Sequence, residues 1–295
     1  MRKAIAVLIA IGFVLGISGV AQAGVLVTKA YEGFDDYAAG TNLTSTGADG
    51  GWSTGWGGVG TTIGTFVVQS PDLTNGAFTS AGQTATGGRA YHTAFGAYDE
   101  ISRGLVDSVD LGVDATYYFT WTTAWMSNSP SMAASSLLFL GNKTTYFGLF
   151  GSGLATSTSI YENRMIPVVR LSGATTYDQT TLFPTFYPAA QNYFLVARIA
   201  ASATGDDTLS LKVYTDTDTP TPENYLNPAT WTVSVTTQSD AVYDSLGIKG
   251  RHWYTVDGMW HDEVTYLSDV IPVPEPAGLG LIGLGLLALK RRRRS

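Results

Sequence analysis

Carboxylates are the first candidates for chemistry in this sequence, and their spacing argues against a glycosidase. Such an enzyme needs two carboxyl groups that converge on one glycosidic bond. One strand can supply them two positions apart, because alternate residues point to the same face. None of the five glutamates outside the C-terminal tail has an aspartate two positions later: Glu32, Glu100, Glu162, Glu223 and Glu263. The sequence therefore predicts a non-enzymatic protein, while a carboxylate pair from separate strands leaves a glycan hydrolase or lyase as an alternative.

Four aspartates around one expected strand are the candidates for a metal site. Asp206, Asp207, Asp216 and Asp218 flank the alternating run at residues 209–214. Calcium is bound by clustered loop carboxylates and carbonyls, which these loops offer. The chain has no twelve-residue calcium-binding loop, so aspartates that cap solvated turns are the alternative. The sequence predicts no organic cofactor and leaves calcium as the possible metal.

Nucleophilic and redox chemistry have little support. The three histidines, His92, His252 and His261, are too scattered to predict a catalytic triad or a histidine metal site. There is no cysteine, which excludes thiol catalysis, thiolate zinc sites and iron–sulfur clusters. Without cross-links, an exported domain must take its stability from a large apolar core.

Tryptophans are the candidates for binding a sugar, because an aromatic ring can stack on a pyranose face. Trp52 and Trp56 lie between glycine pairs, at residues 50–51 and 57–58, that would leave the rings exposed. The alternative is that both are buried at the end of the domain. The other five divide into two that flank loops, Trp253 and Trp260, and three expected in the core, Trp121, Trp125 and Trp231.

The charge distribution excludes nucleic acid as a partner. Of the 17 basic residues, two lie before Gly24 and five lie after Pro276. The chain between them has ten basic and 24 acidic residues, a net charge of −14. A domain this acidic repels phosphates, and no basic patch with interleaved aromatics is present.

The elements that must position these side chains are expected to be strands. Short β-branched and aromatic runs recur between Gly, Asn, Asp and Pro clusters, as in a sandwich or barrel. The clearest runs cover residues 115–126, 193–201 and 209–214. Other strands are expected at 61–69, 89–95, 101–109, 135–140, 146–150, 166–171, 231–236 and 259–267. With no amphipathic helix between residues 24 and 272 and a loop at 215–227, the sequence predicts an all-β protein: one antiparallel β-sandwich of about a dozen strands.

The N-terminus has the composition of a targeting segment. Basic residues at positions 2–3 precede an apolar run at residues 4–20 and a small-x-small cleavage site at Ala21 and Ala23. This order predicts a secretory signal peptide over residues 1–23, removed by signal peptidase.

The C-terminus has three parts in a fixed order. Pro274-Glu275-Pro276 precedes an apolar run at residues 277–289 and five basic residues at 290–294. The prolines keep the first part extended. The apolar run is about 20 Å long as a helix, against about 30 Å for a bilayer core, and the basic residues hold its end in the cytoplasm. A plain tail anchor is the alternative to a sorting signal.

This C-terminal order closely resembles the PEP-CTERM sorting signal of Gram-negative envelope proteins, which the membrane enzyme exosortase recognises. The resemblance implies that the protein is held transiently in the inner membrane, is cleaved near Pro274–Pro276, and is released to the envelope or the extracellular matrix. It also implies an association with exopolysaccharide and biofilm. The domains expected are residues 1–23 (signal peptide), 24–272 (sandwich) and 273–295 (sorting signal).

The start of the mature chain is similar to concanavalin A-like (LamG-like) jelly-roll domains. The residues that carry this similarity are Tyr31 to Asp35, Gly50-Gly51-Trp52 and Gly55-Trp56. It implies two antiparallel sheets with Greek-key connections. The function expected is that of a non-enzymatic, exosortase-processed surface or matrix protein, with a carbohydrate-binding module as the alternative and polysaccharide as the possible partner.

Overall fold

The computed structural model describes residues 25–43, 50–58, 66–70, 78–81, 88–92, 99–126, 135–142, 145–153, 164–170, 187–188, 192–251 and 258–270. The chain divides into two units, Thr28–Ser268 and the two termini, Met1–Val27 with Asp269–Ser295. The first unit holds the sandwich. The domain boundaries predicted at residues 23 and 272 lie outside the described residues and stay predictions.

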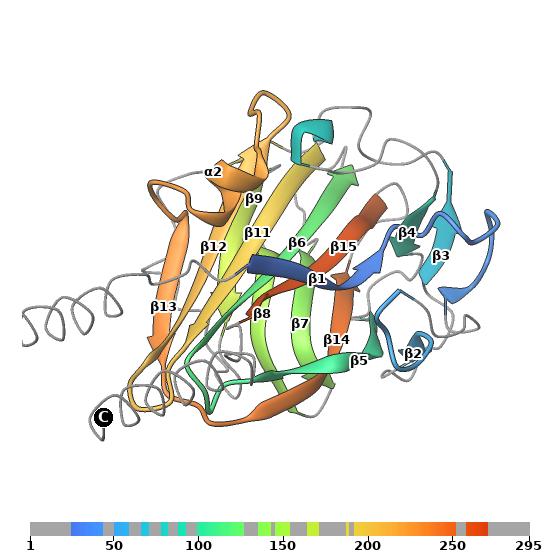
Figure 1. Ribbon diagram of the computed structural model, residues 1–295. Coiled ribbons are helices and arrows are strands. Elements are labelled where there is room, and N and C mark those ends of the chain that lie inside the picture. Colours follow the sequence, from blue (N-terminus) through green and yellow to red (C-terminus); the bar gives the residue numbers. More distant parts are fainter. Residues whose placement is uncertain are drawn as a thin grey trace, which may run out of the picture. The chain divides into compact units, whose positions relative to one another are not determined.

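Eight strands form one sheet of the sandwich (Figure 1). Along the sheet they are β13 (Val233–Thr237), β12 (Asp207–Thr215), β11 (Asn192–Ala201), β6 (Ala115–Met126), β15 (Gly258–Val270), β4 (Arg89–His92) and β3 (Phe66–Gln69). The eighth strand, β1 (Val25–Glu32), also pairs with β15.

Seven strands form the second sheet. In order they are β10 (Tyr187–Pro188), β9 (Arg164–Arg170), β8 (Thr145–Gly153), β7 (Ser135–Asn142), β14 (Val242–Arg251), β5 (Asp99–Asp110) and β2 (Gly57–Gly58). Among the described residues, two short helices accompany the sheets, a 3₁₀ turn at Thr79–Ala81 and α2 (Pro222–Leu226).

Each sheet combines runs of consecutive strands, β11 to β13 and β7 to β10, with strands from distant parts of the chain. The chain leaves the first sheet after β6, forms β7 to β9 in the second, returns for β11 to β13, and crosses again between β14 and β15. All the pairs whose register the structure defines are antiparallel. The protein is therefore a single antiparallel β-sandwich, as the alternating runs predict, and of the jelly-roll type, as the resemblance to concanavalin A-like domains implies.

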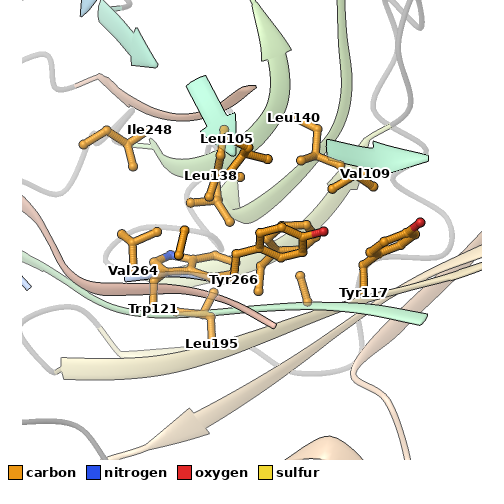
Figure 2. Close-up of a cluster of buried hydrophobic side chains, with 14 of the residues drawn as sticks. Leu105, Val109, Tyr117, Trp121, Leu138, Leu140, Leu195, Ile248, Val264 and Tyr266 are labelled. Carbon is orange, nitrogen blue, oxygen red and sulfur yellow. The ribbon is translucent and has the colours of Figure 1, made fainter. Parts of the chain in front are cut away.

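The core lies between the two sheets, where alternate residues of facing strands meet (Figure 2). Trp121 and Leu195 come from the eight-stranded sheet, and Leu138 and Ile248 come from the other. All four side chains are fully buried. Burial of such side chains supplies about 1.5–3 kcal/mol each, which compensates for the missing cross-links.

Strand β14 was not expected from the sequence, because glycines and charges interrupt its pattern. The structure explains Gly247, which faces both neighbouring strands. A Cβ atom there would lie 2.2 Å from a ring carbon of Phe139 and 2.7 Å from the carbonyl oxygen of Ile101. Glycine is the residue that allows this close approach of three strands.

The expectation that residues 215–227 form only a loop is wrong in one detail. The five-residue helix α2 begins with Pro222, which is favoured in a first turn because its missing N–H would have no helical partner. Asn224 Oδ1 accepts a hydrogen bond from the Thr221 N–H at 2.8 Å. The helix places Tyr225 against Phe194 with ring centroids 5.3 Å apart.

Candidate functional site

The eight-stranded sheet has an outer face, which points away from the core. On β6, Phe119 and Trp121 belong to the core, so Tyr118, Thr120 and Thr122 lie on the outer face. Strand registers align these three with residues of β15, β11, β12 and β13 in cross-strand rows. The first row is Leu267, Tyr118, Arg198, Ser210 and Ser234; the second is Thr265, Thr120, Val196 and Lys212; the third is Asp262, Thr122, Phe194 and Tyr214.

All three rows are buried where they cross β6, since Tyr118, Thr120 and Thr122 are 6%, 2% and 0% exposed. Asp262, Thr122 and Phe194 of the third row are fully buried. Phe78 and Tyr225 cover Phe194, with ring centroids at 5.8 and 5.3 Å. The accessible polar side chains of the rows therefore lie mainly toward β11, β12 and β13.

The Trp231 cluster consists of five side chains at this end of the face: Arg198, Lys212, Tyr214, Trp231 and Ser234. The Arg198 guanidinium carbon lies 4.6 Å from the centroid of the Trp231 ring, a cation–π contact. Trp231 is only partly buried and precedes β13. The expectation that Trp231 lies in the core is therefore wrong, because the strand begins two residues later than its alternating pattern implied.

The other members of the cluster are held by neighbouring strands. Ser234 Oγ lies 2.8 Å from Ser210 Oγ, and the Lys212 ammonium lies 5.8 Å from the Tyr214 ring centroid. The Tyr214 hydroxyl donates to the Asn224 carbonyl at 3.4 Å. Burial, together with the negative charge of Asp218, raises the pKa of Tyr214 to about 12. The phenol therefore stays protonated and can donate hydrogen bonds at any physiological pH.

A second aromatic cluster lies on the same face across β3, β4 and β15. The Arg89 guanidinium carbon is 4.7 Å from the Trp260 ring centroid, and Tyr91 stacks obliquely on Trp260 at 5.4 Å. The indole N–H of Trp260 donates to Gln69 Oε1 at 2.9 Å. Because Trp260 is only 8% exposed, this cluster offers less aromatic surface than the Trp231 cluster.

Trp52 and Trp56 are buried, and the expectation of exposed rings is wrong. Their exposed fractions are 3% and 2%. Trp52 donates to the Tyr31 carbonyl at 2.9 Å, and Trp56 donates to Glu32 Oε2 at 3.0 Å. The adjacent glycine serves chain packing, since a Cβ on Gly51 would lie 1.9 Å from the Lys29 carbonyl oxygen. The structure thus favours the alternative, in which both indoles belong to the core.

The two indoles enclose a buried ion pair that the sequence did not reveal. Arg103 and Glu32 contact each other through Nη1 and Oε2, and they are 1% and 5% exposed. The guanidinium carbon of Arg103 lies 5.0 Å from the Trp52 ring and 5.6 Å from the Trp56 ring. Burial raises the pKa of Glu32, while Arg103 and the hydrogen bond from the Phe34 N–H oppose this shift. The Glu32 carboxylate is thus held by groups of the fold itself, which indicates a structural role.

Two of the three histidines lie close together, although no sequence pattern pairs them. His92 and His261 are fully buried near Phe66, with ring centroids at 5.1 and 6.1 Å from it. Burial, helped by His92, lowers the pKa of His261 to about 3. His261 is therefore neutral at physiological pH and contributes no positive charge to a site. His252 lies outside the described residues.

The adjacent acids Asp262 and Glu263 lie at a bulge in β15, where the register with β6 shifts. The backbone of Glu263 has a φ angle of 53°, which is uncommon for a residue other than glycine. Its N–H donates to Asp262 Oδ1 at 3.0 Å, and its Oε2 accepts from the Tyr31 hydroxyl at 2.8 Å. Both carboxylates are fully buried and have hydrogen-bond donors of the fold as partners.

The four aspartates proposed for calcium do not converge. Asp206 and Asp207 lie at one end of β12, and Asp216 and Asp218 lie at the other, about 25–30 Å away for nine strand residues. Asp207 is buried and accepts from the N–H groups of Ser202 and Ser239, both at 3.0 Å. Asp218 accepts from Thr215 at 2.7 Å. A single calcium site from these four is therefore wrong, and no group of three potential metal ligands occurs among the described residues.

Comparison with protein families identifies the C-terminal segment. Residues 272–294 match the PEP-CTERM protein-sorting motif, which includes Pro274, Glu275 and Pro276. These residues, and the cleavage-site residues Ala21 and Ala23, lie outside the described ranges. Within those ranges no helix is long and apolar enough to cross a membrane. No curated protein matches the chain in sequence.

Solved structures that resemble the chain include a carbohydrate recognition domain and an enzyme. The globular domain of T. cruzi calreticulin aligns with a TM-score of 0.46 and 10% identity, covering 90% of this chain and 95% of its own. The carbohydrate recognition domain of Emp47p gives 0.43 and 10%, covering 86% and 100%. The endo-β-1,4-glucuronan lyase of the fungus Trichoderma reesei gives 0.43 and 8%, covering 81% and 95%.

The C-terminal motif indicates that the chain is an exported protein. The motif also indicates that the protein is anchored transiently in the membrane. The chain is an exported protein that carries a PEP-CTERM sorting motif at its C-terminus and an antiparallel β-sandwich before it.

Proposed function

We propose that this chain is a non-enzymatic surface protein that adheres to extracellular polysaccharide through the Trp231 cluster. In this proposal signal peptidase removes residues 1–23, exosortase cleaves near Pro274–Pro276 at the inner membrane of a Gram-negative cell, and the sandwich is released to the envelope or the biofilm matrix. The PEP-CTERM motif at residues 272–294 supports the route.

The observation that carries the binding proposal is the partly exposed Trp231 beside hydroxyl and cationic groups. Sugars are bound by an aromatic ring against the pyranose face and by polar groups that orient the hydroxyls. The Trp231 cluster offers one indole, the hydroxyls of Tyr214 and Ser234, and the cations of Arg198 and Lys212. These side chains lie on or beside three paired strands, so the surface is formed before the ligand arrives.

The environments of the buried carboxylates support a role without catalysis. Glu32 and Asp207 accept hydrogen bonds from backbone and side-chain donors of the fold, and Asp262 and Glu263 do so at the β15 bulge. A general acid must reach the proton that it transfers in a bound substrate. All four carboxylates are 0–5% exposed and are satisfied by the protein itself.

A binding assay on the full-length chain in mild detergent tests the proposal. Removal of the Trp231 ring should weaken retention on immobilised exopolysaccharide about tenfold, because one stacking contact contributes roughly 1–2 kcal/mol. Trp231→Phe keeps a ring and should retain most of the affinity, and neither change should lower the melting temperature much. Equal binding by Trp231→Ala, or no retention of the native chain on any polysaccharide with or without calcium, contradicts the proposal.

A further inference from the structure

Two cations lie side by side in the Trp231 cluster of an otherwise acidic domain. Arg198 pairs with Ser210 across β11 and β12, and Lys212 is two residues beyond Ser210 on the same face. This makes Arg198 and Lys212 diagonal neighbours across the two strands, about 7–8 Å apart. Between residues 24 and 276 the chain has only ten basic residues against 24 acidic ones, so two neighbouring cations are a local exception.

The protein does not neutralise these two cations itself. Lys29 is paired with Asp107 and Arg103 with Glu32, but Arg198 and Lys212 form no ion pair with a carboxylate in the described part of the chain. Their cross-strand partners on this face are uncharged: Tyr118, Ser210 and Val196.

The nearest acidic side chains on this face are too distant or already engaged. Asp262 lies on β15, three strands from β12, which corresponds to about 14 Å. Asp218 accepts hydrogen bonds from both the N–H and the hydroxyl of Thr215, at 2.7 and 2.9 Å, and its negative charge acts on Tyr214 of the cluster, but it forms no ion pair with either cation. The Tyr214 phenol stays neutral and adds no negative charge. With two cations and this one carboxylate, the cluster therefore keeps a net positive charge toward a ligand.

We infer that the ligand of the Trp231 cluster is an acidic polysaccharide, whose uronate carboxylate binds between Arg198 and Lys212 while the sugar ring lies against Trp231. This inference rests on the proposed function and names the substrate class of the same site. A guanidinium binds a carboxylate with two parallel hydrogen bonds, and an ammonium adds a point charge. Because Arg198 contacts one face of the Trp231 indole, a carboxylate on Arg198 brings its own sugar ring beside that indole.

The same charges disfavour a nucleic acid as the occupant. Binding to a duplex takes many phosphate contacts along the backbone. Two cations on a domain with a net charge of −14 cannot offset the repulsion of such a polyanion. A single carboxylate per sugar, held at one place, fits the cluster better.

The test compares one polymer in two charge states. The full-length chain in mild detergent is titrated with polygalacturonate and with the same polymer after reduction of its carboxyl groups, followed by tryptophan fluorescence. The variants are Arg198→Gln and Lys212→Gln, and Lys29→Gln is the matched control, since it removes a cation from β1. Duplex DNA is the comparison polyanion.

We expect polygalacturonate to bind about tenfold or more tightly than the reduced polymer, as for a charge-assisted hydrogen bond. Arg198→Gln and Lys212→Gln should each lose about tenfold on polygalacturonate and nothing on the reduced polymer, while Lys29→Gln binds as the native chain does. Equal binding of both polymers overturns the inference and leaves the proposed function standing. If neither polymer nor any neutral glycan binds, both the inference and the proposed function are wrong. Equal binding of DNA overturns the inference, because the cluster then binds polyanions in general. Because the polymer comparison needs no variant, a misfolded variant does not affect it.

Discussion

Replacement of Arg103 by methionine should destabilise the sandwich strongly, because it leaves Glu32 buried without its cation. Arg103 and Glu32 are 1% and 5% exposed, and water cannot take the place of the guanidinium. Breaking a buried ion pair from one side costs about 3–5 kcal/mol. For a domain of this size each kcal/mol lowers the melting temperature by about 2–4 °C, so a fall of roughly 6–20 °C is expected.

The loss of folding stability caused by Arg103→Met should also depend on pH. Burial already raises the pKa of Glu32, and Arg103 is the largest influence that opposes it. Without Arg103, folded Glu32 holds its proton at pH values where the unfolded chain has lost it. Stability then falls as pH rises from the ordinary glutamate pKa, 4.5, toward the raised value, by about 1.4 kcal/mol per pH unit. The variant should therefore lose more stability at pH 8 than at pH 5.

Urea unfolding followed by tryptophan fluorescence at both pH values measures this effect. The double variant Glu32→Gln with Arg103→Met should lose less than the sum of the single changes and show little of the added pH dependence. The control is Lys29→Met, which breaks a more exposed pair with Asp107, of 23% and 52% exposed side chains, and should cost no more than about 1 kcal/mol. A loss below 1 kcal/mol for Arg103→Met, or the same loss at pH 5 and pH 8, refutes the reasoning.

Three further changes separate stability from sorting. Trp56→Ala should lower stability by about 3–5 kcal/mol in thermal unfolding and leave polysaccharide binding by the folded fraction unchanged; weaker binding at an unchanged melting temperature contradicts its place in the core. His261→Leu should make the domain less sensitive to acid, because the lowered pKa of His261 gives stability that is present above pH 6.5 and lost as pH falls toward 3, roughly 4–5 kcal/mol in all; an unchanged acid unfolding curve speaks against it. Alanines at Pro274, Glu275 and Pro276 should leave the chain uncleaved in the inner membrane of an exosortase-containing cell, and maturation at the native rate means the motif is not the signal.

The strands with a regular period of two were predictable from the sequence. The bounds expected for β6 agree with Ala115–Met126, and β11 and β12 differ from expectation by a residue or two at their ends. Phe119, Trp121 and Leu195 then lie in the core as alternation requires. Local patterns determine these elements because one face of each strand is buried by the other sheet.

Features that depend on contacts between distant residues were not predictable. Arg103 and Glu32 are 71 residues apart, and no local pattern pairs them. The glycines beside Trp52 and Trp56 do not depend on exposure of the rings, because the backbone of β1 approaches Gly51 closely. Exposure of an aromatic ring depends on which strand covers it, and glycines beside the ring carry no information about that.

The candidate site was missed for a related reason. The alternation of Trp231 with Val233 and Val235 predicted a core residue, but the strand begins at Val233 and leaves Trp231 beside Arg198. Arg198 and Lys212 are 14 positions apart and become neighbours only through the antiparallel register of β11 and β12. A hairpin alignment of these two strands around Gly205 was the one signal that could have found them.

A crystal structure of the protein with a bound oligogalacturonide tests the central claim most directly. The sugar should lie on the outer face of the eight-stranded sheet, with one ring against Trp231 and a uronate carboxylate within about 3.2 Å of nitrogen atoms of Arg198 and Lys212. An ordered sugar bound at any other surface, with the Trp231 cluster empty, contradicts the claim.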